Sequence, residues 1–243
     1  MRALVLAAGL RTHLRPLTDL CAKPAIPVAG EPLIRRIAGW LAAHEVTDLV
    51  VNLHHLPHTL TAVLGDGSDL SVRVRYSWEQ PHVLGSAGGP RQALDIIGDD
   101  TFVVVNGDTL TDLNLGALID AHRRSDALVT LALVLNREPE KYGGVRLDDD
   151  GEVTGFVPRG AAASGCYHFI GVQVVHADAF RPLAPGQPVN SIGGVYEALI
   201  AARRGSIRGF LSEAAFWDIG TPEDYAKTSA VFAEREADAR RTS

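Results

Sequence analysis

The chain has 243 residues, of which 46% are hydrophobic and 21% are charged, and it carries a formal net charge of −6. This length can bury a sizeable core, and it fits one α/β domain better than two small ones. The negative net charge argues against non-specific electrostatic binding of nucleic acid, which requires clustered lysine and arginine. We therefore expect a globular protein that does not bind nucleic acid.

The chain opens with a short apolar segment, MRALVLAAGL, in which a basic residue precedes the apolar run. A secretory signal peptide begins in a similar way, but this run is far shorter than the roughly 20 residues of a membrane span. We therefore interpret Ala3 to Ala8 as a buried first strand and expect no membrane association. The two cysteines, Cys21 and Cys166, form no CxxC pair, which fits a reducing cytoplasm.

Through the first half of the chain, short runs of Val, Leu and Ile alternate with helical patterns. This alternation is typical of βαβ units and a largely parallel sheet. The predicted strands are Ala3 to Ala8, Asp48 to Leu53, Val72 to Ser77 and Thr101 to Asn106. The predicted helices are Pro32 to His44, His58 to Leu64, Gly88 to Ile97 and Asn114 to Arg124, the last with Asn114 as its cap.

The second half changes character, because its strands are joined by turns. The predicted strands are Leu128 to Leu135, Gly144 to Leu147, Glu152 to Phe156 and Phe169 to Val175. The sequence DDDG at Asp148 to Gly151 indicates a hairpin between two of them. Asn190 to Ala202 and the polar segment Glu223 to Arg240 are predicted helices, and the latter is a candidate for self-association into a homodimer. No internal repeat occurs, which excludes a trailing parallel β-helix.

The turn after the first strand reads LAAGLRTHLRPLT over residues 6–18. It follows a parallel strand at the edge where open α/β sheets bind ligands. The small residues at 7–9 let the backbone approach a nucleotide, and Arg11, Arg15 and Lys23 supply charge for phosphate oxygens. An ordinary surface loop is the alternative reading. Neither GxGxxG after the first strand nor a GxxxxGK loop occurs, so dinucleotide and P-loop sites are disfavoured.

Two aspartates are candidates for a cation site. Asp108 ends VVVNGD at the same sheet edge, and Asp218 lies in FWDIGTP. Mg²⁺ usually takes one or two protein carboxylates together with phosphate oxygens, so either aspartate could hold it. Each could equally be a turn or cap residue. The histidines of NLHHLPHTL lack an acidic partner and are interpreted as strand-end and helix-start residues.

Together these segments resemble the sugar-1-phosphate nucleotidyltransferase family from Met1 to about Tyr225. The family motif LAAGxGTRLRPLT, followed by PKPxxPVxGxP, is similar to residues 6–32, and SWEQPHVLGSAGG at 77–89 resembles the base-contacting loop. The segments 106–108 and 217–222 resemble the two metal-carboxylate motifs. The resemblance implies an α/β fold with a Rossmann-like, mixed and mostly parallel sheet and helices on both faces. The nucleotidyltransferase domain would span 1–225, and a helical tail would span 226–243.

The resemblance also implies an activity, namely transfer of a nucleotidyl group from an NTP, with GTP or UTP favoured, to a sugar 1-phosphate, releasing pyrophosphate. The chain resembles the short members of the family, such as mannose- and heptose-1-phosphate guanylyltransferases and N-acetylmuramate-1-phosphate uridylyltransferase. Mg²⁺ would be held by Asp108 and Asp218. The other implied residues are Arg11, His13, Arg15 and Lys23 for catalysis, Leu6, Ala7, Ala8, Gly9, Glu79, Gly85 and Asn106 for the nucleotide, and Gly143, Arg159 and Gly171 for the sugar phosphate.

The phosphate loop departs from the family pattern. The second loop glycine of the family is Arg11 here, its triphosphate-binding arginine is His13, and its sugar-phosphate lysine becomes Arg159 after Pro158. An unperturbed imidazole titrates near pH 6.5, so His13 carries only part of the charge. Arg11 could replace that charge, or it could strain the loop by about 1 to 3 kcal/mol where φ is positive. The alternative function is a catalytically impaired relative that binds a nucleotide sugar and acts as a regulatory subunit.

Overall fold

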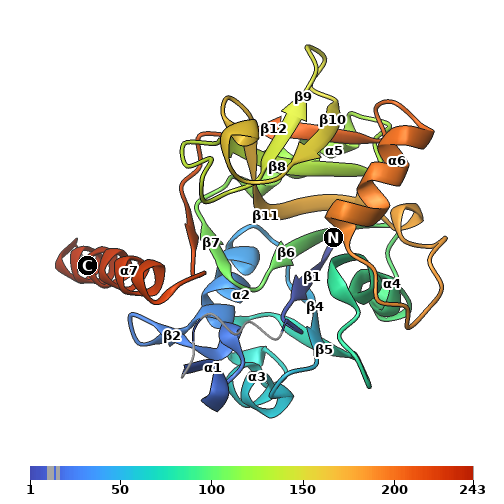
Figure 1. The fold of residues 1–243 in the computed structure, drawn as a ribbon. Coiled ribbons are helices and arrows are strands. Elements are labelled where there is room, and N and C mark those ends of the chain that lie inside the picture. The colour runs from blue at the N-terminus through green and yellow to red at the C-terminus, as the bar shows by residue number, and fades with distance from the viewer. Residues whose placement is uncertain (10–13, 15–16, 243) are drawn as a thin grey trace.

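The computed structural model describes residues 1–9, 14 and 17–242, and Figure 1 shows its fold. In this part of the chain the central sheet has nine strands, with the order β10-β9-β11-β6-β1-β4-β5 and with β8 joining β12 to β11. The strands are β1 (Arg2–Leu6), β4 (Asp48–Leu53), β5 (Arg73–Trp78), β6 (Thr101–Asn106), β8 (Val129–Leu135), β9 (Gly144–Leu147), β10 (Val153–Val157), β11 (Tyr167–His176) and β12 (Ile207–Leu211).

The sheet is mixed. β5, β4, β1 and β6 form a parallel block, and β11 joins the block antiparallel to β6. The central strands carry continuous apolar runs because both faces of the block are covered, which is usual for buried parallel strands. The predicted α/β class and sheet type are confirmed.

Helices cover both faces of the parallel block. On one face, α2 (Leu33–Ala43), α3 (Pro57–Leu64) and α5 (Leu115–Arg123) share a core with Val5. On the other, α4 (Gly85–Ile97) and α6 (Tyr196–Ala202) share a core with Leu4. Consecutive residues of β1 point to opposite faces because the side-chain period of a strand is two. The cap predicted for α5 is confirmed, since Asn114 Oδ1 accepts a hydrogen bond from Ala117 N at 3.0 Å.

Several short elements were not predicted. A ribbon of β7 (Thr109–Thr111) and β13 (Phe216–Asp218) pairs antiparallel, and β2 (Pro27–Val28) pairs with β3 (Glu31–Pro32). The one-turn helix α1 (Leu17–Leu20) and the edge strand β12 were also missed. Apart from β12, these elements have two to four residues, which is too short for a hydrophobic period to identify them. β7, β13 and β12 are defined by pairing with strands that are distant in the sequence.

The helix predicted over Asn190 to Ala202 is wrong in its first part. Ile192 is extended and Gly193 has a φ of 81°, so the regular helix α6 begins at Tyr196. The Glu197 carboxylate accepts hydrogen bonds from Gly193 N at 2.8 Å and Gly194 N at 3.0 Å. Gly193 permits this turn because glycine adopts a positive φ readily, and the glutamate stabilises it.

The last helix, α7 (Pro222–Thr242), lies at the side of the molecule in Figure 1. The predicted division between residues 225 and 226 falls inside it. Its start is packed on the domain, because Thr228 is buried and Tyr225 Oη donates a hydrogen bond to Pro27 O at 2.9 Å. No helix in the described part of the chain combines the length and the hydropathy that a bilayer span requires.

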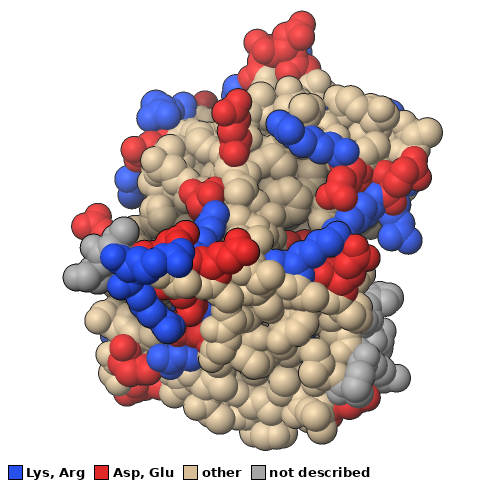
Figure 2. Space-filling model, turned by 90° about the vertical axis from the view of Figure 1, so that its left-hand side faces the viewer, with Lys and Arg blue, Asp and Glu red and all other residues tan. Residues whose placement is uncertain are grey.

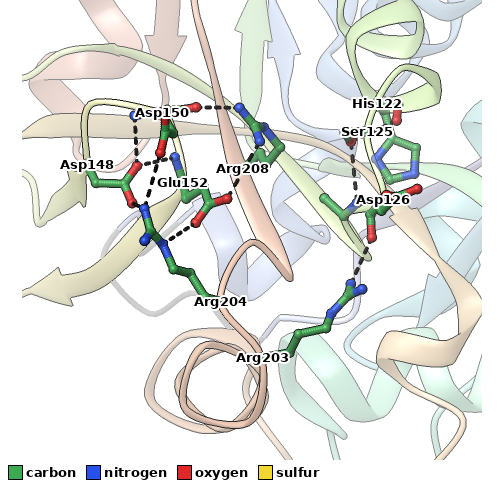
Figure 3. A network of polar contacts seen from close by, with 10 residues as sticks. His122, Ser125, Asp126, Asp148, Asp150, Glu152, Arg203, Arg204 and Arg208 are labelled. Carbon is green, nitrogen blue, oxygen red and sulfur yellow. Dashed lines mark hydrogen bonds and ion pairs between the residues drawn. The ribbon is translucent and has the colours of Figure 1, made fainter.

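The predicted acidic hairpin turn joins β9 to β10. Gly151 has a φ of 76°, and the Arg204 guanidinium lies 2.9 Å from Asp148, 3.2 Å from Asp150 and 2.8 Å from Glu152 (Figure 3). Arg204 is 73% exposed, so each of these ion pairs contributes little to stability. The network ties the hairpin to the segment after α6 and explains the acidic run without a metal ion.

Candidate nucleotide and metal site

Three parallel strands end together at one edge of the sheet. Leu6 at the end of β1 pairs in register with Asn52 of β4 on one side and Asn106 of β6 on the other. A cavity of about 320 Å³ opens at this edge. Its lining consists of Leu6, Ala7, Ala8, Gly9, Lys23, Pro24, Asn52, Glu79, Val83, Gly85, Ser86, Asn106, Gly107, Asp108 and Asn190. This edge is where open α/β sheets bind ligands.

A buried network fixes the loops around this cavity. Asn52 Oδ1 accepts a hydrogen bond from Ala7 N at 2.5 Å, and Asn52 Nδ2 donates to Glu79 Oε1 at 2.6 Å. The other carboxylate oxygen of Glu79 accepts from Leu84 N at 2.7 Å. Burial raises the pKa of Glu79, and the two hydrogen bonds oppose that shift. Asn52 and Glu79 therefore join the loop after β1 to the loop that leads into α4.

The glycines of the GSAGG motif allow α4 to approach this network closely. A Cβ on Gly89 would collide with Glu79 Oε1 and lie 2.8 Å from Asn52 Nδ2, and a Cβ on Gly88 would collide with the Gln187 carbonyl oxygen. Gly85, with a φ of 76°, lies against Asn190, so a side chain there would be strained as well. The motif therefore has a packing role in addition to any contact with a base.

A distant segment completes the cavity wall. Val189 O accepts hydrogen bonds from Ala87 N at 3.0 Å and from Gly88 N at 3.1 Å. Ser191 N donates to Ser86 Oγ at 2.8 Å. These bonds hold Asn190 against the start of α4, where its side chain lines the cavity. Sequence reasoning missed Asn190 and Asn52, because neither belongs to a motif that signals nucleotide binding.

The two candidate metal carboxylates lie close together because of the β7–β13 ribbon. Asp218 pairs with Thr109, the residue after Asp108, and Ile219 N donates a hydrogen bond to Asp108 O at 3.2 Å. Lys23 Nζ lies 2.9 Å from Asp108 Oδ2, with side-chain exposures of 2% and 10%. Burial raises the pKa of Asp218, and the negative charge of Asp108 adds to this effect while Lys23 opposes it. The two carboxylates and the Lys23 ammonium therefore interact electrostatically at this point.

A second cavity, of about 150 Å³, adjoins the first and shares Asn106 and Asp108 with it. The remaining lining residues are Thr109, Tyr142, His168, Phe169, Ile170, Gly171, Phe216 and Asp218. The Tyr142 and His168 rings stack with centroids 4.2 Å apart. Burial lowers the pKa of His168 to about 4, so this imidazole is neutral at physiological pH. The two carboxylates therefore lie at the junction of a larger and a smaller cavity.

Most of the predicted site residues meet at this junction. Leu6, Ala7, Ala8, Gly9, Lys23, Glu79, Gly85, Asn106 and Asp108 line the first cavity, and Asn106, Asp108, Gly171 and Asp218 line the second. Gly143 and Arg159 are exposed and line neither cavity, although Arg159 follows the strand that packs beside Gly143. Arg11, His13 and Arg15 lie outside the described residues. The assigned roles of all these residues stay predictions.

The side chains of the two histidines that follow β4 contact backbone carbonyl oxygens of neighbouring segments. His54 Nδ1 lies 2.8 Å from Glu79 O, and His55 Nε2 lies 3.1 Å from Thr18 O. Among the described residues, no cluster of three or more His, Cys, Asp or Glu side chains could hold a metal ion. The pair of Asp108 and Asp218 still suits Mg²⁺, because this ion takes few protein carboxylates and completes its shell with phosphate and water.

A family model described as "Nucleotidyl transferase" matches residues 2–235. The chain belongs to this family. It is 34% identical over 235 residues to a mannose-1-phosphate guanylyltransferase of Mycobacterium tuberculosis, covering 94% of this chain and 63% of that protein. It is 44% identical over 121 residues to an N-acetylmuramate alpha-1-phosphate uridylyltransferase of Neisseria meningitidis, covering 48% of this chain and 51% of that protein.

The chain thus spans less than two thirds of the length of the Mycobacterium relative, and its match to the Neisseria relative covers about half of each protein. Among solved structures, HddC from Yersinia pseudotuberculosis complexed with GMP-PN has a TM-score of 0.81 at 22% identity, covering 95% of this chain and 99% of that chain. This likeness shows the same fold. The family membership agrees with the resemblance found in the sequence motifs.

Proposed function

We propose that the chain transfers a nucleotidyl group from an NTP to a sugar 1-phosphate, giving an NDP-sugar and pyrophosphate. The observation that carries the proposal is the placement of Asp108, Asp218 and Lys23 at the junction of two adjoining cavities. The first cavity would take the nucleoside and its α-phosphate. The second would take the sugar phosphate. The names of the relatives support this class of reaction.

The chemistry that we propose is an in-line displacement. An oxygen of the sugar phosphate attacks the α-phosphorus, the bond from that phosphorus to the bridging oxygen breaks, and pyrophosphate leaves. This reaction requires positioning and charge neutralisation rather than a covalent nucleophile. Lys23 suits the task because an ammonium has three donor protons, so it can hold Asp108 and still donate to a phosphate oxygen.

Magnesium is part of the proposal. Asp108 and Asp218 would hold the ion, which would neutralise charge on the phosphates and draw them together. The placement of Asp218 beside Asp108 supports this assignment: Asp218 pairs with Thr109, and both carboxylates line the second cavity. Asn106 and Gly171 would frame the same point, because a Cβ on Gly171 would lie 2.8 Å from Asn106 Nδ2.

The nucleotide that we favour is GTP or UTP, which the guanylyltransferase and uridylyltransferase relatives support. The catalytically impaired alternative, in which Arg11 and His13 block the loop, has no observation in its favour. The cytoplasm is the proposed location, and the two free cysteines fit that compartment. A homodimer stays a prediction, which sedimentation equilibrium would test.

The experiment is a pyrophosphate-release assay with Mg²⁺, a panel of GTP, UTP, CTP, dTTP and ATP, and a set of hexose, heptose and N-acetylated sugar 1-phosphates. We expect release that requires one NTP and one sugar phosphate together. Absence of release in every combination, with nucleotide sugar still bound in calorimetry, would instead support the regulatory alternative. In that case, the combined change Arg11→Gly and His13→Arg should restore activity.

A further inference from the structure

An ion pair connects the two sides of the second cavity. Lys141 Nζ lies 2.6 Å from Asp224 Oδ1, and the two side chains are 34% and 14% exposed. Lys141 belongs to the 137–143 loop between β8 and β9, whereas Asp224 lies in the first turn of α7. The pair therefore bridges segments that are far apart in the sequence. Neither residue belongs to the nucleotide or metal assignments above.

Asp224 is fixed relative to the metal carboxylate Asp218. Thr221 Oγ1 donates to Asp224 Oδ2 at 2.8 Å, and Asp224 N donates back to Thr221 Oγ1 at 3.1 Å. This is the reciprocal arrangement of a threonine and an acidic residue three positions later at a helix start. Both carboxylate oxygens of Asp224 are therefore engaged, one by the helix cap and one by Lys141. The turn that follows Asp218 is rigid as a result.

The 137–143 loop carries Tyr142 into the second cavity. Asn136 Nδ2 donates to Tyr142 O at 3.1 Å, which anchors the loop to the end of β8. The Tyr142 ring stacks on His168 and meets Phe216 edge-on at 5.5 Å between centroids. Tyr142 and Asp218 line the same cavity from opposite segments. Two contacts therefore hold this loop beside the Asp218 segment, namely the Tyr142–Phe216 ring contact and the Lys141–Asp224 ion pair.

We propose that Lys141 and Asp224 act as positioning residues that set the place of the sugar 1-phosphate relative to Asp218. This inference rests on the proposed function. The ion pair holds the 137–143 loop, with Tyr142 and Gly143, at a fixed distance from the IGTPED turn. Lys141 and Asp224 line neither cavity, so they act on the second one through Tyr142, whereas no residue of the 137–143 loop lines the first. Loss of the pair frees one wall of the second cavity, so binding of the sugar phosphate must also order that wall, which lowers its affinity.

The same helix turn offers a matched control. Lys227 Nζ lies 2.7 Å from Glu223 Oε1, and these side chains are 70% and 76% exposed and line neither cavity. We would measure steady-state kinetics of Lys141→Met, Asp224→Asn, the double variant and Lys227→Met. We expect KM for the sugar phosphate to rise at least fivefold in each single variant at Lys141 or Asp224. KM for the NTP should change less than twofold, and Lys227→Met should match the wild type.

KM for the sugar phosphate should rise no further in the double variant than in the single variants, because each single change already removes the Lys141–Asp224 interaction. Lys141→Arg should restore KM to within twofold of the wild type, which a loss of packing alone would not allow. The proposal would be overturned if KM rose equally for the NTP and the sugar phosphate. It would also be overturned if the effects of the two single changes on KM for the sugar phosphate added in the double variant.

Amide hydrogen exchange separates this inference from the proposed function. The Lys141 and Tyr142 amides both donate to Glu138 O at 2.9 Å, so their exchange reports the order of the loop. We expect faster exchange over 137–143 in Lys141→Met and unchanged exchange in Lys227→Met, whether or not the protein turns over sugar phosphates. Unchanged exchange in Lys141→Met would refute the positioning role, whereas a wild type without turnover would refute the proposed function.

Discussion

Gly89→Ala tests the packing that supports the nucleotide cavity. In a helix interior alanine is more favourable than glycine by about 1 kcal/mol. At this position, however, the new methyl group would collide with Glu79 Oε1 inside a buried network. Relief requires the carboxylate to move, which sacrifices at least one of its hydrogen bonds from Asn52 and Leu84. A hydrogen bond to a charged group contributes about 1.5 to 3 kcal/mol, so we expect a net loss of about 0.5 to 2 kcal/mol.

The assay is urea unfolding combined with calorimetry of nucleotide binding. Gly39→Ala is the matched control, because Gly39 lies within α2 and a Cβ there meets nothing within 4 Å. We expect this control to gain up to about 1 kcal/mol and to bind nucleotide unchanged. Gly89→Ala should lose stability and bind nucleotide more weakly, since the same network holds Ala7 N. A gain in stability equal to that of Gly39→Ala would refute the reasoning.

Three further outcomes follow from single sites. Burial lowers the pKa of His122 to about 4, with a smaller contribution from His176. Below pH 6.5 the unfolded chain therefore binds a proton at this histidine that the folded protein does not bind. The free energy of unfolding is fully retained above pH 6.5 and should fall by up to about 3 kcal/mol as the pH drops to 4. His122→Gln should flatten this dependence in urea titrations at pH 7 and 5. Asn190→Ala should raise KM for the NTP about three- to tenfold with little change for the sugar phosphate, because Asn190 lines the first cavity and its amide would lose one hydrogen bond to the bound nucleotide. Lys23→Met removes the ammonium that lies 2.9 Å from Asp108 Oδ2 and should lower stability by about 1.5 to 3 kcal/mol, the value of a hydrogen bond to a charged group. Mg²⁺ should raise the melting temperature of this variant more than that of the wild type.

The parallel half of the fold could be predicted because its strands are continuous apolar runs between strongly patterned helices. Asp48 to Leu53 and Thr101 to Asn106 were placed with the observed bounds. These runs are buried on both faces, so their composition reports their position directly. The strand ends also placed Asp108 and Lys23 at one sheet edge, and the structure brings the two side chains into contact.

The features that complete the site could not be predicted, because they depend on contacts between distant segments. The β7–β13 ribbon pairs residues more than 100 positions apart and has three residues in each strand. Asn190 reaches the cavity only because Val189 and Ser191 bind the start of α4. The segment before α6 was predicted to be helical, but Ile192 is extended and Gly193 has a positive φ, which interrupts the helix.

The central claim is nucleotidyl transfer at Asp108, and ³¹P NMR of the complete reaction tests it most directly. The wild type, with Mg²⁺, the preferred NTP and the preferred sugar 1-phosphate, should produce equal amounts of pyrophosphate and a sugar nucleotide with two coupled phosphorus resonances. Asp108→Asn should form neither product while still binding nucleotide in calorimetry. Conversion of the NTP to free NDP and phosphate, or full activity in Asp108→Asn, would contradict the account.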